Sequence, residues 1–152
     1  MRARIIVSAV CVFDADGRLL TVRKRGTSMF MQPGGKPEPG ESAVHAAARE
    51  LAEEVGISIS PQELITLGVW IADAANEAAT DIEATVFRAP GAWTAAPAAE
   101  IVEIRWLDLN APWPTDLAPL LTRHVLPALL TRADALTDRP RTEQPLTKQP
   151  GG

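Results

Sequence analysis

Three glutamates, Glu50, Glu53 and Glu54, lie within a little more than one helical turn of one another. On a helical wheel, Glu53 falls about 60° to one side of Glu50 and Glu54 about 40° to the other, so the three carboxylates share one face. Each like-charged pair at this spacing costs roughly 0.2–0.5 kcal/mol even in water. Arg49 supplies only one nearby positive charge. A hard divalent cation prefers oxygen ligands and would remove the repulsion, so the pattern indicates a metal site on a helix.

The alternative is an ordinary acidic helix surface, and the residues around the glutamates argue against it. Glycines and prolines over 34–40 predict a stiff, kinked loop whose backbone can approach a ligand closely. Glu41 and Ser42 suit the start of a helix, and Gly56 suits its end. A helix is therefore predicted over 42–55. Apolar residues at helical spacing predict its buried stripe: Val44, Ala47, Ala48, Leu51 and Val55.

The run from Gly35 to Ile57 resembles the signature of the Nudix (MutT-like) hydrolase family at every fixed position. That signature reads glycine, five residues, glutamate, seven residues, Arg-Glu, an aliphatic residue, any residue, Glu-Glu, any residue, glycine and an aliphatic residue. A chance match is on the order of one in a billion per starting position. The motif is specific for the family and says little about the substrate.

The resemblance implies an enzyme that hydrolyses a nucleoside diphosphate linked to another moiety, with water attacking phosphorus and Mg²⁺ or Mn²⁺ as cofactor. By the family pattern, Glu50, Glu53 and Glu54 form the metal-binding set. The carbonyl of Gly35 is an additional candidate ligand. Arg49 would orient a catalytic glutamate, although an ordinary surface ion pair is the alternative for this residue. Glu41 would brace Arg49 or the loop.

The general base stays open between the helix and a later loop. Glu50 is the first choice on the helix. Glu100 is the first candidate outside it, and an exposed position without a chemical role is its alternative. Two further acids are weaker candidates: Glu103 and Glu83.

Candidate substrate-binding residues precede the glycine loop. The run Arg23-Lys24-Arg25, at the end of a predicted strand, either meets phosphates or forms a solvated strand end, and Arg23 and Arg25 are the candidates selected from it. Phe30 either edges a base pocket or plugs the loop onto the core. Each pair of interpretations stays open at this point.

The range of candidate substrates is reduced only by residues that the chain lacks. It contains no tyrosine, so it lacks the tyrosine of Nudix dinucleoside-polyphosphate hydrolases. Ala72 stands where ADP-ribose hydrolases of the family tend to have proline. A nucleoside triphosphate, oxidised or non-standard, is favoured by elimination. The alternatives are an ADP-ribose or nucleotide-sugar diphosphatase, a non-catalytic Nudix-fold nucleotide sensor and, more remotely, an isoprenyl diphosphate isomerase.

The composition predicts one globular domain over 1–137, since 46% of the 152 residues are hydrophobic. A Pro-rich tail over 138–152 is expected to be flexible or held by a neighbour. The single cysteine, Cys11, excludes an internal disulfide and fits a reducing cytoplasm, where it is expected to be buried. The net charge of −4 argues against stable nucleic-acid binding, and no apolar run approaches the ~18 residues of a membrane span. The expected partner is a small-molecule nucleotide, with a homodimer left open.

The remaining pattern predicts strands joined by polar loops. Asp116 is expected to cap a second helix, with Pro119 in its first turn and Pro127 kinking or dividing it. These elements predict an α+β fold, a mixed sheet covered by helices on both faces, and the resemblance implies the Nudix α/β/α sandwich. Strands are expected over 4–13, 18–25, 64–71, 82–88 and 101–107, and loops over 26–36, 72–81 and 89–97.

Overall fold

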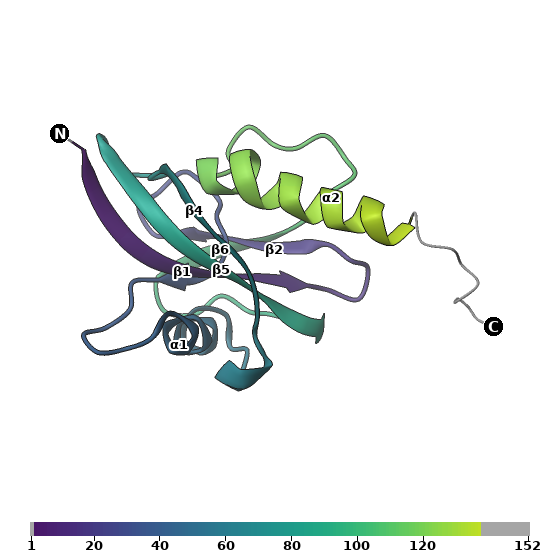
Figure 1. Cartoon of the computed structure of the whole chain (residues 1–152), viewed down its shortest axis with the longest axis horizontal. Coiled ribbons are helices and arrows are strands. Elements are labelled where there is room, and N and C mark those ends of the chain that lie inside the picture. The colour runs from purple at the N-terminus through teal and green to yellow at the C-terminus, as the bar shows by residue number, and fades with distance from the viewer. Residues whose placement is uncertain (1, 138–152) are drawn as a thin grey trace.

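The computed structural model describes residues 2–137, and the side chains of residues 2–132. The tail predicted over 138–152 lies outside the described residues. Within them, the chain forms a six-stranded mixed sheet and two α-helices (Figure 1). The strands are β1 (Ala3–Phe13), β2 (Leu19–Lys24), β3 (Gly34–Gly35), β4 (Ile65–Asp73), β5 (Thr80–Ala92) and β6 (Ile101–Leu107).

The sheet is built around β1. Its strand order is β4-β5-β1-β2-β6, and β3 pairs with β1 beside this path. β1 and β5 run parallel, while the other pairings are antiparallel. Helix α1 (Ala43–Val55) lies on one face of the sheet and α2 (Leu126–Thr137) on the other (Figure 1). The predicted α/β/α arrangement is confirmed.

Each face of the sheet has its own apolar core, because side chains alternate along β1. Val10 and Val12 pack on the α1 side with Leu51. Cys11 packs on the α2 side with Val125, and its thiol is fully buried, as expected. α1 is therefore fixed to the sheet by its apolar stripe, and this fixes the direction of its acidic residues.

Helix α1 begins and ends where the sequence predicted. Ser42 is its N-cap, and the Oγ of Ser42 accepts a hydrogen bond from the backbone N–H of His45 at 3.3 Å. Gly56 ends the helix in the left-handed conformation, with φ of 73°. Only glycine adopts this conformation without steric cost, so the position of Gly56 is required by the turn.

The loops around the predicted strands are shorter than expected, because backbone pairing continues past the apolar side chains. β5 pairs with β1 from Ala3↔Thr80 onward and continues, after a register shift, to Phe13↔Ala92. The connection between β4 and β5 shortens to 74–79. β3 was not predicted. It forms because Gly34 has no side chain and can approach the backbone of Ser8, with which a Cβ atom would collide.

The prediction that Asp116 caps the second helix is wrong. The carboxylate of Asp116 instead accepts hydrogen bonds from Arg105 of β6, with Nη1 of Arg105 3.2 Å from Oδ2 of Asp116. The helical segment begins at Pro119 and passes through a wider, π-helical turn, Leu121–Val125, before α2. Pro127 has no N–H to donate, and the wider turn directly before it accommodates the proline without ending the helix.

Candidate active site

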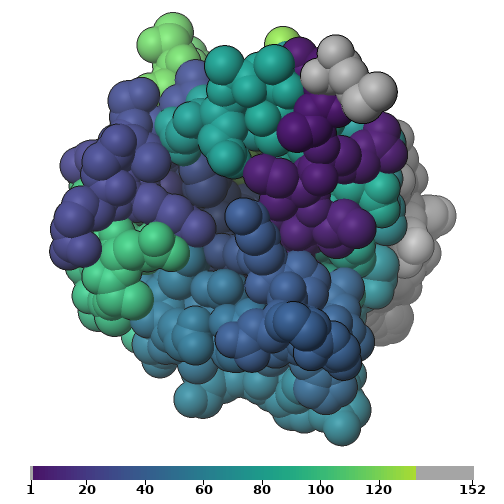
Figure 2. Space-filling model, turned by 90° about the vertical axis from the view of Figure 1, so that its left-hand side faces the viewer, coloured from purple at the N-terminus to yellow at the C-terminus, as the bar shows by residue number. Residues whose placement is uncertain are grey.

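A cavity of about 550 Å³ opens beside β1, between the signature helix α1, the segment before β3 and the β4–β5 connection. In Figure 2 it is the hollow between the purple N-terminal strand, the teal β4–β5 segment and the indigo segment that precedes β3. The volume suits a nucleotide-sized ligand, since ligand sites usually fall in the range of about 300–1,000 Å³.

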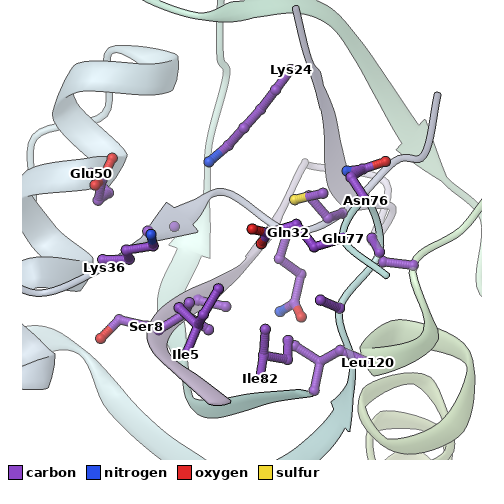
Figure 3. A pocket seen from close by; sticks show the side chains of 18 of the residues that line it. Ile5, Ser8, Lys24, Gln32, Lys36, Glu50, Asn76, Glu77, Ile82 and Leu120 are labelled. Carbon is purple, nitrogen blue, oxygen red and sulfur yellow. The ribbon is translucent and has the colours of Figure 1, made fainter. Parts of the chain in front are cut away.

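The two ends of the cavity differ in chemistry. Lys24, Lys36 and Glu50 gather at one end, and the ammonium group of Lys24 points toward Glu50 (Figure 3). Ile82 and Leu120 lie at the other end. One end therefore suits a charged group and the other an apolar, planar one.

Glu54 is the most buried acid of the signature helix, with its side chain 1% exposed. Its Oε1 accepts a hydrogen bond from the backbone N–H of Gly34 at 3.1 Å. Its Oε2 has no hydrogen-bond partner among the described residues, although the Nζ of Lys24 lies 3.5 Å away. Burial raises the pKa of Glu54 to about 7, and the charge of Lys24 opposes the rise.

Glu50 lies against the glycine loop. A Cβ atom on Gly35 would collide with its carboxylate, so glycine is required for this close approach. The Oε2 of Glu50 lies 3.3 Å from the Nη1 of Arg49. Burial raises the pKa of Glu50, while Arg49 acts in the opposite direction.

Glu53 diverges from the other two acids. Its side chain is 54% exposed, and its Oε1 lies 3.2 Å from the Nη1 of Arg49. The three carboxylates predicted to share one helical face therefore differ in burial, from Glu54 in the core to Glu53 at the solvent. Among the described side chains, no three or more His, Cys, Asp or Glu residues are gathered closely enough to hold a metal ion as they stand.

Arg49 joins the helix to the loop that precedes it. Its Nε and Nη2 donate to the two carboxylate oxygens of Glu41, both at 2.9 Å, and Nη2 also donates to the carbonyl of Lys36 at 3.2 Å. The hydrogen bonds from Arg49 lower the pKa of Glu41 to about 2. Because Nη1 of Arg49 also contacts Glu50 and Glu53, the guanidinium fixes the orientation of these carboxylates.

Glu100, on the loop before β6, lines the cavity. Its carboxylate is 56% exposed, and Oε2 lies 3.6 Å from the Nζ of Lys24. Its backbone is held in place, because the carbonyl of Glu100 accepts a hydrogen bond from the N–H of Arg25 at 2.8 Å. The structure thus brings this loop residue to the same lysine that contacts Glu54. The weaker candidates Glu103 and Glu83 contact Arg23 and Arg4 instead, outside the residues that line the cavity.

The three predicted substrate-binding residues lie outside the cavity lining. Arg23 pairs with Glu103 at 3.0 Å, and Arg25 is exposed to solvent. Phe30 is 3% exposed and packs in the core beneath the guanidinium of Arg105, 3.8 Å from the ring centroid. For Phe30 the structure thus supports the core interpretation.

Of the lining residues, Lys24 was a candidate only as part of the run Arg23-Lys24-Arg25, and Gln32 was not singled out from the sequence. A signal for Lys24 was present, because it follows Leu20 and Val22 at period two, and both of these pack on the α1 side of the sheet. No sequence signal marked Gln32, since its importance depends on burial.

The residues present fit a hard divalent cation. Glu54 has a buried carboxylate oxygen without a hydrogen-bond partner among the described residues, and Glu50 lies near it against Gly35. Burial opposes the charge on both carboxylates, and a cation would favour it. The donors are all oxygens, which suits Mg²⁺ or Mn²⁺.

The family model of the NUDIX domain matches residues 2–129. The chain therefore belongs to the NUDIX family, as the run from Gly35 to Ile57 indicated. In the described part of the chain, no helix is both long and apolar enough to cross a membrane.

Individual relatives match over different extents. Phosphatase NudJ of Escherichia coli K12 is 46% identical over 68 residues, which cover 43% of this chain and 44% of NudJ. The chain thus spans less than half the length of the curated relatives that it matches. The MutT protein of Methanosarcina mazei Go1 superposes with a TM-score of 0.67 and 21% identity, over 91% of this chain and 98% of that one. The MutT NUDIX hydrolase of Burkholderia pseudomallei superposes with a TM-score of 0.67 and 22% identity, over 83% of this chain and 98% of that one. At such identities the two structures show the shared fold alone.

Proposed function

We propose that the protein is a divalent-cation-dependent pyrophosphohydrolase that cleaves a nucleoside triphosphate to the monophosphate and pyrophosphate. Water adds to a phosphorus atom, the anhydride P–O bond breaks, and the bridging oxygen leaves with pyrophosphate. The observation that carries the proposal is the two-ended cavity. Glu50 and Lys24 lie at its charged end and Ile82 and Leu120 at the other. Glu100 also lines the cavity, with its Oε2 3.6 Å from the Nζ of Lys24.

Glu50 and Glu54 are the first ligands that we assign to Mg²⁺ or Mn²⁺. Glu53 on the solvent side and the backbone of Gly35 complete the set. When bound, the cation would polarise the phosphate and lower the pKa of the attacking water. Arg49 acts as a positioning residue, because its hydrogen bonds hold Glu50 and Glu53 and are themselves fixed by Glu41.

Within the run Arg23-Lys24-Arg25, we assign the phosphate-binding role to Lys24, because Arg23 and Arg25 lie outside the cavity lining. The ammonium group of Lys24 lies between the carboxylates of Glu54 and Glu100, at 3.5 and 3.6 Å. A phosphate chain at this end of the cavity would meet a positive charge that is already held in place.

Glu100 is the general base that we propose. It lines the cavity from a loop, while Glu50 and Glu54 are committed to the cation. A separate acid can accept the proton of water without giving up a ligand position. Glu50 remains the alternative on the helix.

The test is a hydrolysis assay with a panel of ribo- and deoxynucleoside triphosphates, oxidised nucleotides, ADP-ribose and nucleotide sugars, each with Mg²⁺ or Mn²⁺. Products separated by anion-exchange chromatography distinguish pyrophosphate release from cleavage of a sugar diphosphate. Monophosphate plus pyrophosphate from a triphosphate is the expected result. Preferred cleavage of ADP-ribose or a nucleotide sugar would replace the proposed substrate. A folded protein that cleaves none of the panel would contradict the enzymatic function and favour a nucleotide sensor.

A further inference from the structure

Gln32 lines the cavity and has a buried side-chain oxygen without a hydrogen-bond partner among the described residues. Its side chain is 4% exposed, and it lines the cavity just before the glycine loop. Its Nε2 donates to the Sγ of Cys11 at 2.9 Å. Its Oε1 is buried and has no hydrogen-bond partner in the described part of the chain. A buried amide oxygen without a partner is destabilising, so a donor from a ligand or an ordered water molecule would be favourable at this position.

The amide is held in place by the thiol below it. Cys11 is fully buried, and burial raises the pKa of its thiol to about 12, so the group stays neutral around pH 7. Gln32 therefore has a neutral partner at its Nε2, and its buried acceptor, Oε1, has no partner among the described residues. A neutral donor matches this acceptor without bringing a further charge into the core.

Apolar side chains lie at the end of the cavity toward which the amide of Gln32 is directed, and Asn76 and Glu77 of the β4–β5 connection also line the cavity. Figure 3 shows the end of the Gln32 side chain directed toward Ile82 and Leu120, and away from Glu50 and Lys24. Ile5 lies at the same end. The aliphatic side chains at this end suit a flat heterocycle with an N–H at its edge, because the ring contacts them and the edge satisfies the amide of Gln32.

We propose that Gln32 is the specificity-determining residue of a nucleobase slot, in which an N–H of the base donates to Oε1 of Gln32. This inference rests on the proposed function, because it takes the charged end of the same cavity as the phosphate site. It adds that the protein recognises the base of a nucleotide, and not only the phosphoanhydride.

The test compares Gln32→Met with Gln62→Met. Methionine keeps the length of the side chain and removes the amide. Gln62 is an exposed glutamine in the short turn Pro61–Glu63, outside the cavity lining, and it serves as the matched control. Binding is measured by calorimetry with non-hydrolysable α,β-methylene analogues of the nucleoside triphosphates. Methylenediphosphonate serves as the ligand without a base, and Mg²⁺ is present throughout.

The expected result is that Gln32→Met weakens binding of the preferred nucleotide analogue about 10- to 100-fold, as for loss of a hydrogen bond in a site built to make it. Binding of methylenediphosphonate should stay unchanged, and Gln62→Met should match the wild type with both ligands. The thermal midpoint of Gln32→Met without ligand should change little, because the substitution removes a buried acceptor that lacks a partner together with the hydrogen bond to Cys11.

Three results would overturn the inference. Equal nucleotide binding by Gln32→Met and the wild type would mean that water or no group meets Oε1. An equal loss with methylenediphosphonate, or a marked fall in the thermal midpoint, would indicate a structural role. If Gln32→Met does not fold, Gln32→Asn keeps the amide but withdraws it by one carbon, and the same selective loss is expected. A wild type that neither binds nor cleaves any nucleotide would instead remove the proposed function.

Discussion

The Nζ of Lys24 lies 3.5 Å from the Oε2 of Glu54, a carboxylate oxygen without a hydrogen-bond partner among the described residues. The pair joins the last residue of β2 to the last turn of α1. It places a positive charge beside a buried acid at the charged end of the cavity. A charge in this position stabilises the ionised form of Glu54 and also attracts an anionic substrate.

Lys24→Met should therefore raise the KM for the nucleotide about tenfold or more, with a smaller effect on kcat, because a charge-assisted contact to phosphate is lost. Steady-state kinetics at fixed Mg²⁺ measures both constants. Arg25→Met is the control, since Arg25 is adjacent but exposed and outside the cavity lining. A larger rise in KM for Arg25→Met than for Lys24→Met would return the phosphate-binding role to the arginine.

Glu54→Gln should lower turnover by at least about a hundredfold, because it removes the charge of a buried ligand. Glu53→Gln should lower it less, since the carboxylate of Glu53 is 54% exposed and pairs with Arg49. Turnover of both variants at saturating Mg²⁺ tests whether Glu54→Gln has the larger effect. Circular dichroism checks that both variants are folded. Near-wild-type turnover in a folded Glu54→Gln protein would remove Glu54 from the site.

Mg²⁺ at millimolar concentration should raise the thermal midpoint of the protein. A cation that binds only the folded state at 100 times its dissociation constant stabilises that state by about 2.7 kcal/mol. Sodium chloride at matched ionic strength should raise the midpoint less, and Glu54→Gln should reduce the shift with Mg²⁺. Equal shifts with both salts would indicate ordinary screening of the acidic helix.

Much of the fold could be predicted because local pattern and tertiary structure agree. Ser42 and Gly56 mark the ends of α1, and its apolar stripe alone indicates which side faces the sheet. The limits of β5 could not be predicted, because they depend on pairing with β1 beyond Pro90. Asp116 has a side chain typical of a helix N-cap, but the distant Arg105 binds it instead.

In the candidate site, too, local pattern predicted some residues, while the burial of others could not be predicted from the sequence. The spacing of the signature placed Arg49 and Glu50 beside the glycine loop, where the structure has them. The helical wheel did not separate Glu53 from Glu54, because burial depends on where the sheet covers the helix. Gln32 carries no motif, and its role follows only from the cavity around it.

Asp116→Asn should lower the free energy of unfolding at pH 7 by up to about 1 kcal/mol, the range for a partly exposed ion pair. The hydrogen bonds from Arg105 lower the pKa of Asp116 in the folded protein. The folded state then binds fewer protons than the unfolded state, so this stabilisation is present above the unfolded pKa and is lost as the pH falls through the folded pKa. Urea titrations of the variant and the wild type between pH 7 and pH 3 should converge toward the acid end. A difference independent of pH would show that Asp116 acts without its charge.

Glu100→Gln should lower kcat while leaving the affinity for Mg²⁺ within a fewfold of normal. Glu100 approaches the cavity from a loop, and its Oε2 lies 3.6 Å from the Nζ of Lys24. Glu50→Gln should weaken both kcat and metal affinity, because Glu50 lies against Gly35 on the helix that we assign to the cation. A base that must lose its proton before it acts produces an acidic limb in the pH–rate profile, and Glu100→Gln should remove or shift that limb. Metal titrations beside the pH–rate profiles of both variants separate the two roles. Full activity of Glu100→Gln with an unchanged acidic limb would assign the base to Glu50.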